Sequence, residues 1–163
     1  GSTALPAEVA TGVPALAKAV TCNTKTQIVP GVPDVTSGGI ALSTIDFQKS
    51  SKSPLGFALA TFTTPTNPAQ ADVATLQNQL NDYLALEAGI RSQPSNNANK
   101  VLLEKIKGPK FFLQFQMARV NAANGVKVSA AGTVAHQQAK VIKNAAGASA
   151  QEIAQVNALA KQT

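Results

Sequence analysis

The sequence has few charged and few aromatic residues. Charged side chains make up 13% of its 163 residues, there is no Trp and one Tyr, and six Phe carry most of the aromatic packing. A chain of this kind covers itself with neutral polar side chains instead of ion pairs, a surface that is common outside the cell. Its length fits one domain whose core buries roughly 68–70% of the unfolded surface. We therefore predict a single domain over residues 1–163.

Cysteine and histidine occur once each, as Cys22 and His136. A single Cys permits no internal disulfide, and we expect Cys22 to be a small buried apolar side chain. One His does not encode the usual His-rich zinc sites, so we expect no metal and no other cofactor. No Ser lies in a nucleophile-elbow motif, and no glycine-rich loop leads into a helix with the Lys and Ser/Thr register that binds phosphate.

Long hydrophobic runs are also absent. No stretch of 18 apolar residues occurs, so the sequence predicts no transmembrane segment. Gly1 and Ser2 are typical of the residues left when a tag is cut off by a protease, and we expect them to be such a remnant. A secretory leader removed before maturation is compatible with this beginning.

The segment from Asn67 to Arg91 shows the clearest helical period. Asn67 can cap the helix, Pro68 suits its first position, and Asp72 favours the positive end of the helix dipole. One face carries a stripe that is apolar except for one carboxylate. Its members are Val73, Leu76, Leu80, Tyr83, Glu87 and Ile90. This helix is expected to be the element on which the others pack.

The first half of the chain contains a segment whose composition is typical of β-strands. Ile, Phe and Thr are concentrated between residues 40 and 64 on either side of a polar loop, which predicts a β-hairpin over 40–64. The alternation slips in both arms, so a bulge or two-sided burial has to be allowed for. Upstream, we predict a short helix over residues 14–21 and an extended loop over residues 28–39, where Pro and Gly punctuate the chain.

Residues 67–163 are predicted to be mainly helical. A short helix is expected over residues 100–107, ended by Gly108 and Pro109, although its apolar run also fits a strand. Residues 111–124 fit both a helix, through spaced Phe and Ala, and a strand, through alternating apolar and Gln residues. The preceding Pro and the closing Asn-Gly favour the helix.

Two more helices are predicted near the carboxyl end. The first covers residues 133–146, and a capping box at residues 149–152 opens the second. Together these elements predict an α+β fold in which a mostly helical layer packs on a small antiparallel β element.

The net charge of +6 lies in the second half of the chain. Residues 1–81 hold four basic and four acidic side chains, whereas residues 82–163 hold ten basic and four acidic ones. Such a basic face either keeps the protein soluble or attracts an anionic partner, such as an acidic polysaccharide, a membrane surface, a host protein or nucleic acid. Nucleic acid has less support, because the half offers few Arg and no Phe that looks exposed. The candidate binding residues are Lys100, Lys105, Lys107, Lys110, Arg119, Lys127, Lys140 and Lys143.

Two other kinds of function have candidate residues. Glu87 on its apolar stripe, together with His136 and a Lys or Arg, could provide general acid/base catalysis for cleavage of RNA or another hydrolysis. The preferred interpretation is structural, with Glu87 paired to Arg91 or Arg119. Separately, Ala-rich helices around the Phe cluster, formed by Phe111, Phe112 and Phe115, could leave a cavity for a small hydrophobic ligand such as a lipid. A closely packed core is the simpler expectation.

The stretches LNDYLALEAGIRS (80–92) and KGPKFFLQFQMAR (107–119) resemble segments of uncharacterised small secreted proteins of filamentous fungi. The resemblance covers the second half of the chain and brings no active-site motif with it. It implies an extracellular location and a role in interaction with hosts, substrates or neighbours. We therefore expect a secreted, effector-like protein that is not an enzyme and that uses its basic second half toward an anionic partner.

Overall fold

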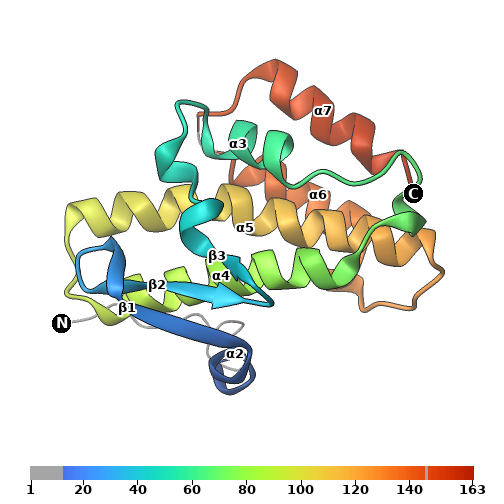
Figure 1. The fold of residues 1–163 in the computed structure, drawn as a ribbon. Coiled ribbons are helices and arrows are strands. Elements are labelled where there is room, and N and C mark those ends of the chain that lie inside the picture. The colour runs from blue at the N-terminus through green and yellow to red at the C-terminus, as the bar shows by residue number, and fades with distance from the viewer. Residues whose placement is uncertain (1–12, 146) are drawn as a thin grey trace.

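The computed structural model describes residues 13–145 and 147–163 (Figure 1). Gly1 and Ser2, the expected tag remnant, lie outside this range. Helices dominate and one small antiparallel sheet is present, so the predicted α+β class is confirmed. The elements in order are α2 (Val13–Ala19), β1 (Val20–Val29), β2 (Val32–Ser37), β3 (Ile40–Ala41), the 3-10 turns η1 (Leu42–Thr44) and η2 (Phe47–Lys49), α3 (Pro54–Thr61), η3 (Pro68–Gln70), α4 (Val73–Ser92), α5 (Asn97–Ala123), η4 (Ala130–Gly132), α6 (Val134–Lys143) and α7 (Ala150–Ala160).

The two longest helices, α4 and α5, lie side by side and antiparallel through the middle of the molecule (Figure 1). Strand β2 packs on α4, whereas α3 and α6 pack on α5, and α7 covers α3 and α6. No helix in the described ranges is long and apolar enough to cross a membrane. The sheet therefore lies on the α4 side of the α4–α5 pair, and α3, α6 and α7 lie on the α5 side.

Helix α4 confirms the predicted apolar stripe but begins later than expected. Asn67 caps only the 3-10 turn η3, whereas the side chain of Asp72 accepts a hydrogen bond from the backbone N–H of Ala74 at 3.0 Å and caps α4 itself. Val73 is consequently exposed in the first turn. The remaining five stripe residues, Leu76, Leu80, Tyr83, Glu87 and Ile90, are buried.

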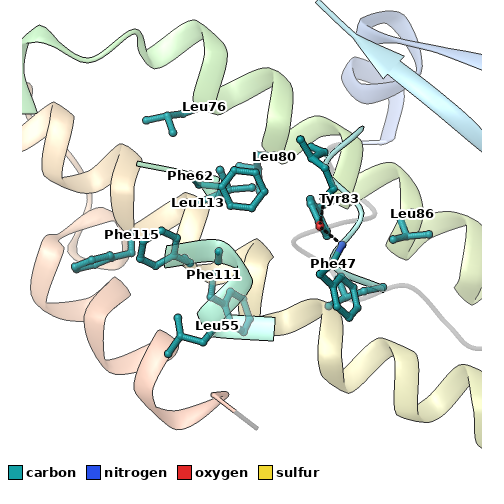
Figure 2. Close-up of a cluster of buried hydrophobic side chains, with 14 of the residues drawn as sticks. Phe47, Leu55, Phe62, Leu76, Leu80, Tyr83, Leu86, Phe111, Leu113 and Phe115 are labelled. Carbon is teal, nitrogen blue, oxygen red and sulfur yellow. Dashed lines mark hydrogen bonds between the residues drawn. The ribbon is translucent and has the colours of Figure 1, made fainter. Parts of the chain in front are cut away.

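Tyr83 connects α4 to the irregular segment that follows the sheet. Its hydroxyl donates to the carbonyl of Ile45 and accepts from the backbone N–H of Phe47 at 3.2 Å (Figure 2). The Phe62 ring meets the Tyr83 ring edge-on, with centroids 6.0 Å apart. One buried tyrosine thus satisfies two backbone groups while its ring fills the core.

Helix α5 runs unbroken from residue 97 to 123, so the predicted break at Gly108 and Pro109 is wrong. Pro109 removes one helical hydrogen bond, but both residues are buried, and Gly108 lies against the start of α3. A Cβ on Gly108 would lie 2.8 Å from the Cβ of Pro54. This close packing compensates for the lost bond. The predicted helix at 111–124 is confirmed, and Gly125 (φ +70°) follows its carboxyl end.

The β-hairpin predicted over 40–64 is wrong, and so is the loop predicted over 28–39. The hairpin consists of β1 and β2, which turn at Gly31 (φ +82°), with β3 as a short third strand. Pro33 is tolerated in β2 because it pairs with Gln27 between two irregularities in register. Residues 54–61 form α3 instead of a strand.

Residues 54–61 form α3 because a capping pattern precedes them, although their Phe and Thr content is typical of a strand. The hydroxyl of Ser53 accepts a hydrogen bond from the N–H of Gly56 at 3.0 Å, and Pro54 occupies the first helical position.

The prediction that Cys22 is buried is wrong. Its side chain is exposed, because β1 is an outer strand of the sheet and residues 21–27 of this strand face solvent.

The two helices predicted near the carboxyl end are present. Thr133 caps α6, which ends at Lys143, and Ala146 lies outside the described residues. The capping box of α7 is complete: the backbone N–H of Glu152 donates to the hydroxyl of Ser149 at 3.1 Å, and the backbone N–H of Ser149 donates to the Glu152 carboxylate at 2.9 Å. Glu152 also accepts a hydrogen bond from Ser53, which ties α7 to the start of α3.

Candidate functional site

A groove of about 640 Å³ lies where the β1–β2 turn, the segment after η2 and the first half of α5 meet. We call it the basic groove. Its lining residues are Val29, Pro30, Phe47, Gln48, Ser50, Lys52, Pro54, Asn97, Ala98, Asn99, Val101, Leu102 and Lys105. Three segments that are distant in the sequence form it, so it exists only in the folded chain.

Capping interactions fix two of the three walls. Asp46 accepts a hydrogen bond from the N–H of Gln48 at 3.0 Å and so holds the 3-10 turn that carries Phe47. The side chain of Asn96 accepts from the N–H of Asn99 at 2.8 Å and starts α5. The first turn of α5 therefore lines the groove with the positive end of the helix dipole.

The floor of the groove is apolar. Phe47 is almost completely covered, Pro54 and Leu102 are partly exposed, and Val101 is 53% exposed. Val29 from the turn adds to this surface. Exposed aliphatic side chains in a concave site are what a ligand with an apolar part requires.

The charge of the groove is positive. Lys52 and Lys105 are both exposed, and no acidic side chain is among the described residues that line the groove. The nearby carboxylate of Asp46 already accepts hydrogen bonds from the side-chain amide of Gln48 at 3.1 and 3.3 Å. The groove consequently presents two ammonium groups beside an apolar floor.

Six of the eight predicted binding residues are at least partly exposed, but they do not form one patch. Lys100 and Lys105 lie on the first half of α5, and Lys105 alone of the eight lines the groove. Lys107 pairs with Glu104 at 3.2 Å. Lys127 lies after the end of α5. Lys140 and Lys143 lie on α6, where the ammonium group of Lys140 is over the ring of Phe111.

The prediction is wrong for Lys110 and Arg119, which are buried. Lys110 forms an ion pair with Glu87 at 2.8 Å. Arg119 donates to the carbonyls of Leu159 and Gln162 at 2.7 and 2.9 Å, and burial lowers its pKa. Arg119 lies one turn after the buried Phe115, and Lys110 lies one turn from the buried Ile106 and Leu113. Helical spacing from these apolar residues was the signal that could have excluded both.

Glu87 and His136 do not share an accessible cleft. Glu87 is buried, one carboxylate oxygen contacts Lys110, and the other lies 3.2 Å from Arg91. The predicted pairing of Glu87 with Arg91 is confirmed. The cation that reaches Glu87 from another helix is Lys110 and not Arg119. His136 is exposed in the first turn of α6, and its backbone N–H donates to Thr133.

Asp82 is a buried carboxyl group that the sequence did not single out. Asp82 on α4 is fully buried, and neither of its oxygens has a hydrogen-bond partner among the described residues. Burial, with a smaller contribution from Asp34 on β2, raises the pKa of Asp82 to about 8. Asp34 itself accepts hydrogen bonds from the backbone and hydroxyl of Ser43 at 3.0 and 2.6 Å. At neutral pH Asp82 is therefore mostly protonated.

Several residues of the groove were missed by sequence reasoning. Lys52 lies in the first half of the chain, where basic and acidic residues balance, so the charge asymmetry pointed away from it. Asn97 and Asn99 lie before the start of the predicted helix over residues 100–107, and Val101 lies in that helix, whose apolar run also fitted a strand. No sequence spacing connects residue 52 with residue 105, because tertiary packing brings them together.

The fold and the groove define a small α+β protein with an open groove lined by two lysines. The chain belongs to the DUF7143 family, described as a domain of unknown function, whose family model matches residues 1–163. The search of curated proteins and the search of solved structures each gave no match.

Proposed function

We propose that the chain is a secreted, effector-like interaction protein, not an enzyme, that binds an anionic partner through the basic groove. The observation that carries this proposal is the convergence of Lys52 and Lys105 on one apolar groove with no acidic residue among its lining. The low charge content of the whole chain and its resemblance to small secreted fungal proteins support an extracellular role.

Electrostatics supply attraction and the apolar floor supplies contact area. Exposed ammonium groups are screened by salt over a Debye length of ~8 Å at physiological ionic strength, so their effect on affinity must fall as salt rises. The partial charge at the amino end of α5 adds to the attraction. An acidic polysaccharide, an anionic membrane surface and an acidic host protein all satisfy this electrostatic requirement.

Nucleic acid is less well supported. Single-stranded nucleic acid is usually held by aromatic side chains on which bases stack. Five of the six Phe residues and Tyr83 are buried, and the sixth, Phe57, is half-buried in edge contact with Phe62. Phosphate contacts alone would then have to provide the affinity.

Carriage of a small hydrophobic ligand is the second candidate function, and the aliphatic floor of the groove favours it. The Phe cluster on α5, which suggested an internal cavity, instead fills the core: Phe112 and Phe115 are fully buried with ring centroids 6.0 Å apart. A carried ligand would therefore bind in the open basic groove.

RNA cleavage by Glu87 and His136 has the least support. The Glu87 carboxylate is buried and paired with two cations, so it cannot reach a substrate without disrupting the α4–α5 interface. Incubation with structured and single-stranded RNA tests this function directly. Cleavage lost in Glu87→Gln with the fold retained would revive it.

The test of the proposed function compares two double variants of equal net charge. Lys52→Gln/Lys105→Gln removes the cations of the groove, whereas Lys127→Gln/Lys143→Gln removes two exposed lysines outside it. On immobilised heparin, we expect the groove variant to elute at lower salt than the control variant. Equal elution of the two variants, or retention of the parent protein that high salt does not weaken, would contradict the proposal.

A further inference from the structure

The geometry points to a free carboxylate with an apolar chain as the ligand of the basic groove, an assignment that rests on the function proposed above. Such a molecule combines the two candidate functions, because its head is anionic and its body is hydrophobic. Three properties of the groove support this ligand class: its dimensions, its floor, and the hydrogen-bond donors that it still offers.

The dimensions fit a small elongated molecule. The volume of about 640 Å³ falls within the range of ~300–1,000 Å³ that is usual for small-molecule sites. From Asn97 to Lys105 the helix advances ~12 Å at 1.5 Å per residue, which gives the length along which a chain can lie. Lys100 extends the cationic surface along α5, whereas Lys127 and Lys143, which a long polyanion would also need, lie on segments that do not line the groove.

The floor provides an aliphatic track for the body of the ligand. Val101 and Leu102 from α5 line the groove together with Pro54 and the Val29–Pro30 turn. Because Val101 is 53% exposed in the free protein, a methylene chain placed over it removes apolar surface from water on both partners. This burial is favourable in proportion to the area covered.

The donors that remain available favour an anion over a neutral polar ligand such as a sugar. Two of the three side-chain amides that line the groove are already engaged: Asn99 donates to the carbonyl of Pro94 at 3.1 Å, and Gln48 donates to Asp46. The Ser50 hydroxyl accepts from the backbone N–H of Lys52 at 3.1 Å. The Ser50 hydroxyl can still donate its own proton, so the lining also offers neutral donors. The two ammonium groups are the charged donors, and a carboxylate is their complementary acceptor.

Calorimetric titration of the intact protein tests the assignment with four probes: decanoate, decanol, acetate and a heparin oligosaccharide. We expect decanoate, used below its micelle concentration, to bind about tenfold more tightly than decanol, because only the carboxylate pairs with the lysines. We expect acetate to bind more weakly still, because it lacks the chain. Decanol binding as tightly as decanoate would overturn the role assigned to the carboxylate.

Two exposed valines provide a matched pair that isolates the apolar contact. Val101 (53% exposed) lines the groove, whereas Val126 (50% exposed) lies outside it. We expect Val101→Asn to weaken decanoate binding about fivefold and Val126→Asn to leave it unchanged, with equal melting temperatures showing that both variants fold. Unchanged affinity in Val101→Asn would overturn the placement of the chain.

The outcomes separate this assignment from the proposed function. If the heparin oligosaccharide binds through Lys52 and Lys105 while decanoate does not bind, the anionic partner stands and the small carboxylate is wrong. If neither probe binds in a manner that depends on these lysines, both proposals fail.

Discussion

The ammonium group of Lys110 lies 2.8 Å from a carboxylate oxygen of Glu87, and both side chains are only 3% exposed. The pair joins α5 to α4 inside their interface, with Arg91 on the other carboxylate oxygen. A buried pair of this kind contributes little net stability compared with apolar residues, but removing one partner leaves a charge that water cannot reach.

We expect Lys110→Met to lower the free energy of unfolding by ~1–3 kcal/mol, because one oxygen of the buried Glu87 carboxylate loses its partner while Arg91 remains on the other. Lys107→Met, which removes the partly exposed partner of Glu104, should cost less than ~1 kcal/mol. Urea denaturation of both variants measures the difference. Similar losses in the two variants would show that the Glu87–Lys110 pair behaves as if it were in solvent.

The raised pKa of Asp82 predicts a pH dependence of stability. Because the folded state keeps the proton up to about pH 8 while the unfolded chain releases it near pH 4, the contribution of Asp82 is complete below pH 4 and is lost as pH rises through this window. The slope is at most ~1.4 kcal/mol per pH unit. We expect Asp82→Asn to be closest to the parent protein at pH 5 and to become the more stable of the two by pH 8.5.

Denaturation of both proteins at intervals between pH 5 and pH 8.5 measures this difference. Parallel stability curves for the parent protein and the variant would mean that Asp82 is already ionised in the folded state.

Gly108 allows α3 to approach α5 closely, and this predicts an unusual sign for a helical Gly→Ala change. In an ordinary helix interior the change stabilises by ~1 kcal/mol. Here the new Cβ would meet Pro54 at 2.8 Å and the backbone N of Leu55 at 3.3 Å. We expect Gly108→Ala to destabilise by ~1–3 kcal/mol through overpacking, which thermal unfolding would detect. A raised melting temperature would refute the close contact.

The position of Cys22 on the outer strand β1 predicts free access to its thiol. We expect one thiol per chain to react with Ellman's reagent in the folded protein, at a rate close to that in denaturant. Cys22→Ser serves as the blank. A reaction that needs denaturant would show that the side chain is covered in solution.

Local signals in the sequence identified the helices whose ends and faces are set by neighbouring residues. Helix α7 follows from the capping box that begins at Ser149, and α4 follows from the stripe that includes Leu76 and Ile90. Pro109 misled the prediction because a helix can retain a proline when tertiary packing compensates for the missing hydrogen bond.

The β-hairpin and the groove depended on contacts that no local pattern records. Gly31 and Pro33 resemble loop residues until β1 and β2 are paired, and the apolar residues of 54–61 resemble a strand until Ser53 caps them as a helix. Likewise, counting charges along the chain selected Lys110 and missed Lys52, because exposure and proximity are set by packing and not by composition.

The continuity of α5 through Pro109 has a mechanical consequence. One stiff rod carries the groove wall at its amino end, the docking point of α3 near its middle, and the guanidinium of Arg119 that anchors the end of α7. A ligand that tilted this rod at one end would swing the opposite end as well. Occupancy of the groove would then change the position of Arg119 and of the end of α7 that it contacts, because α5 is continuous between the two sites.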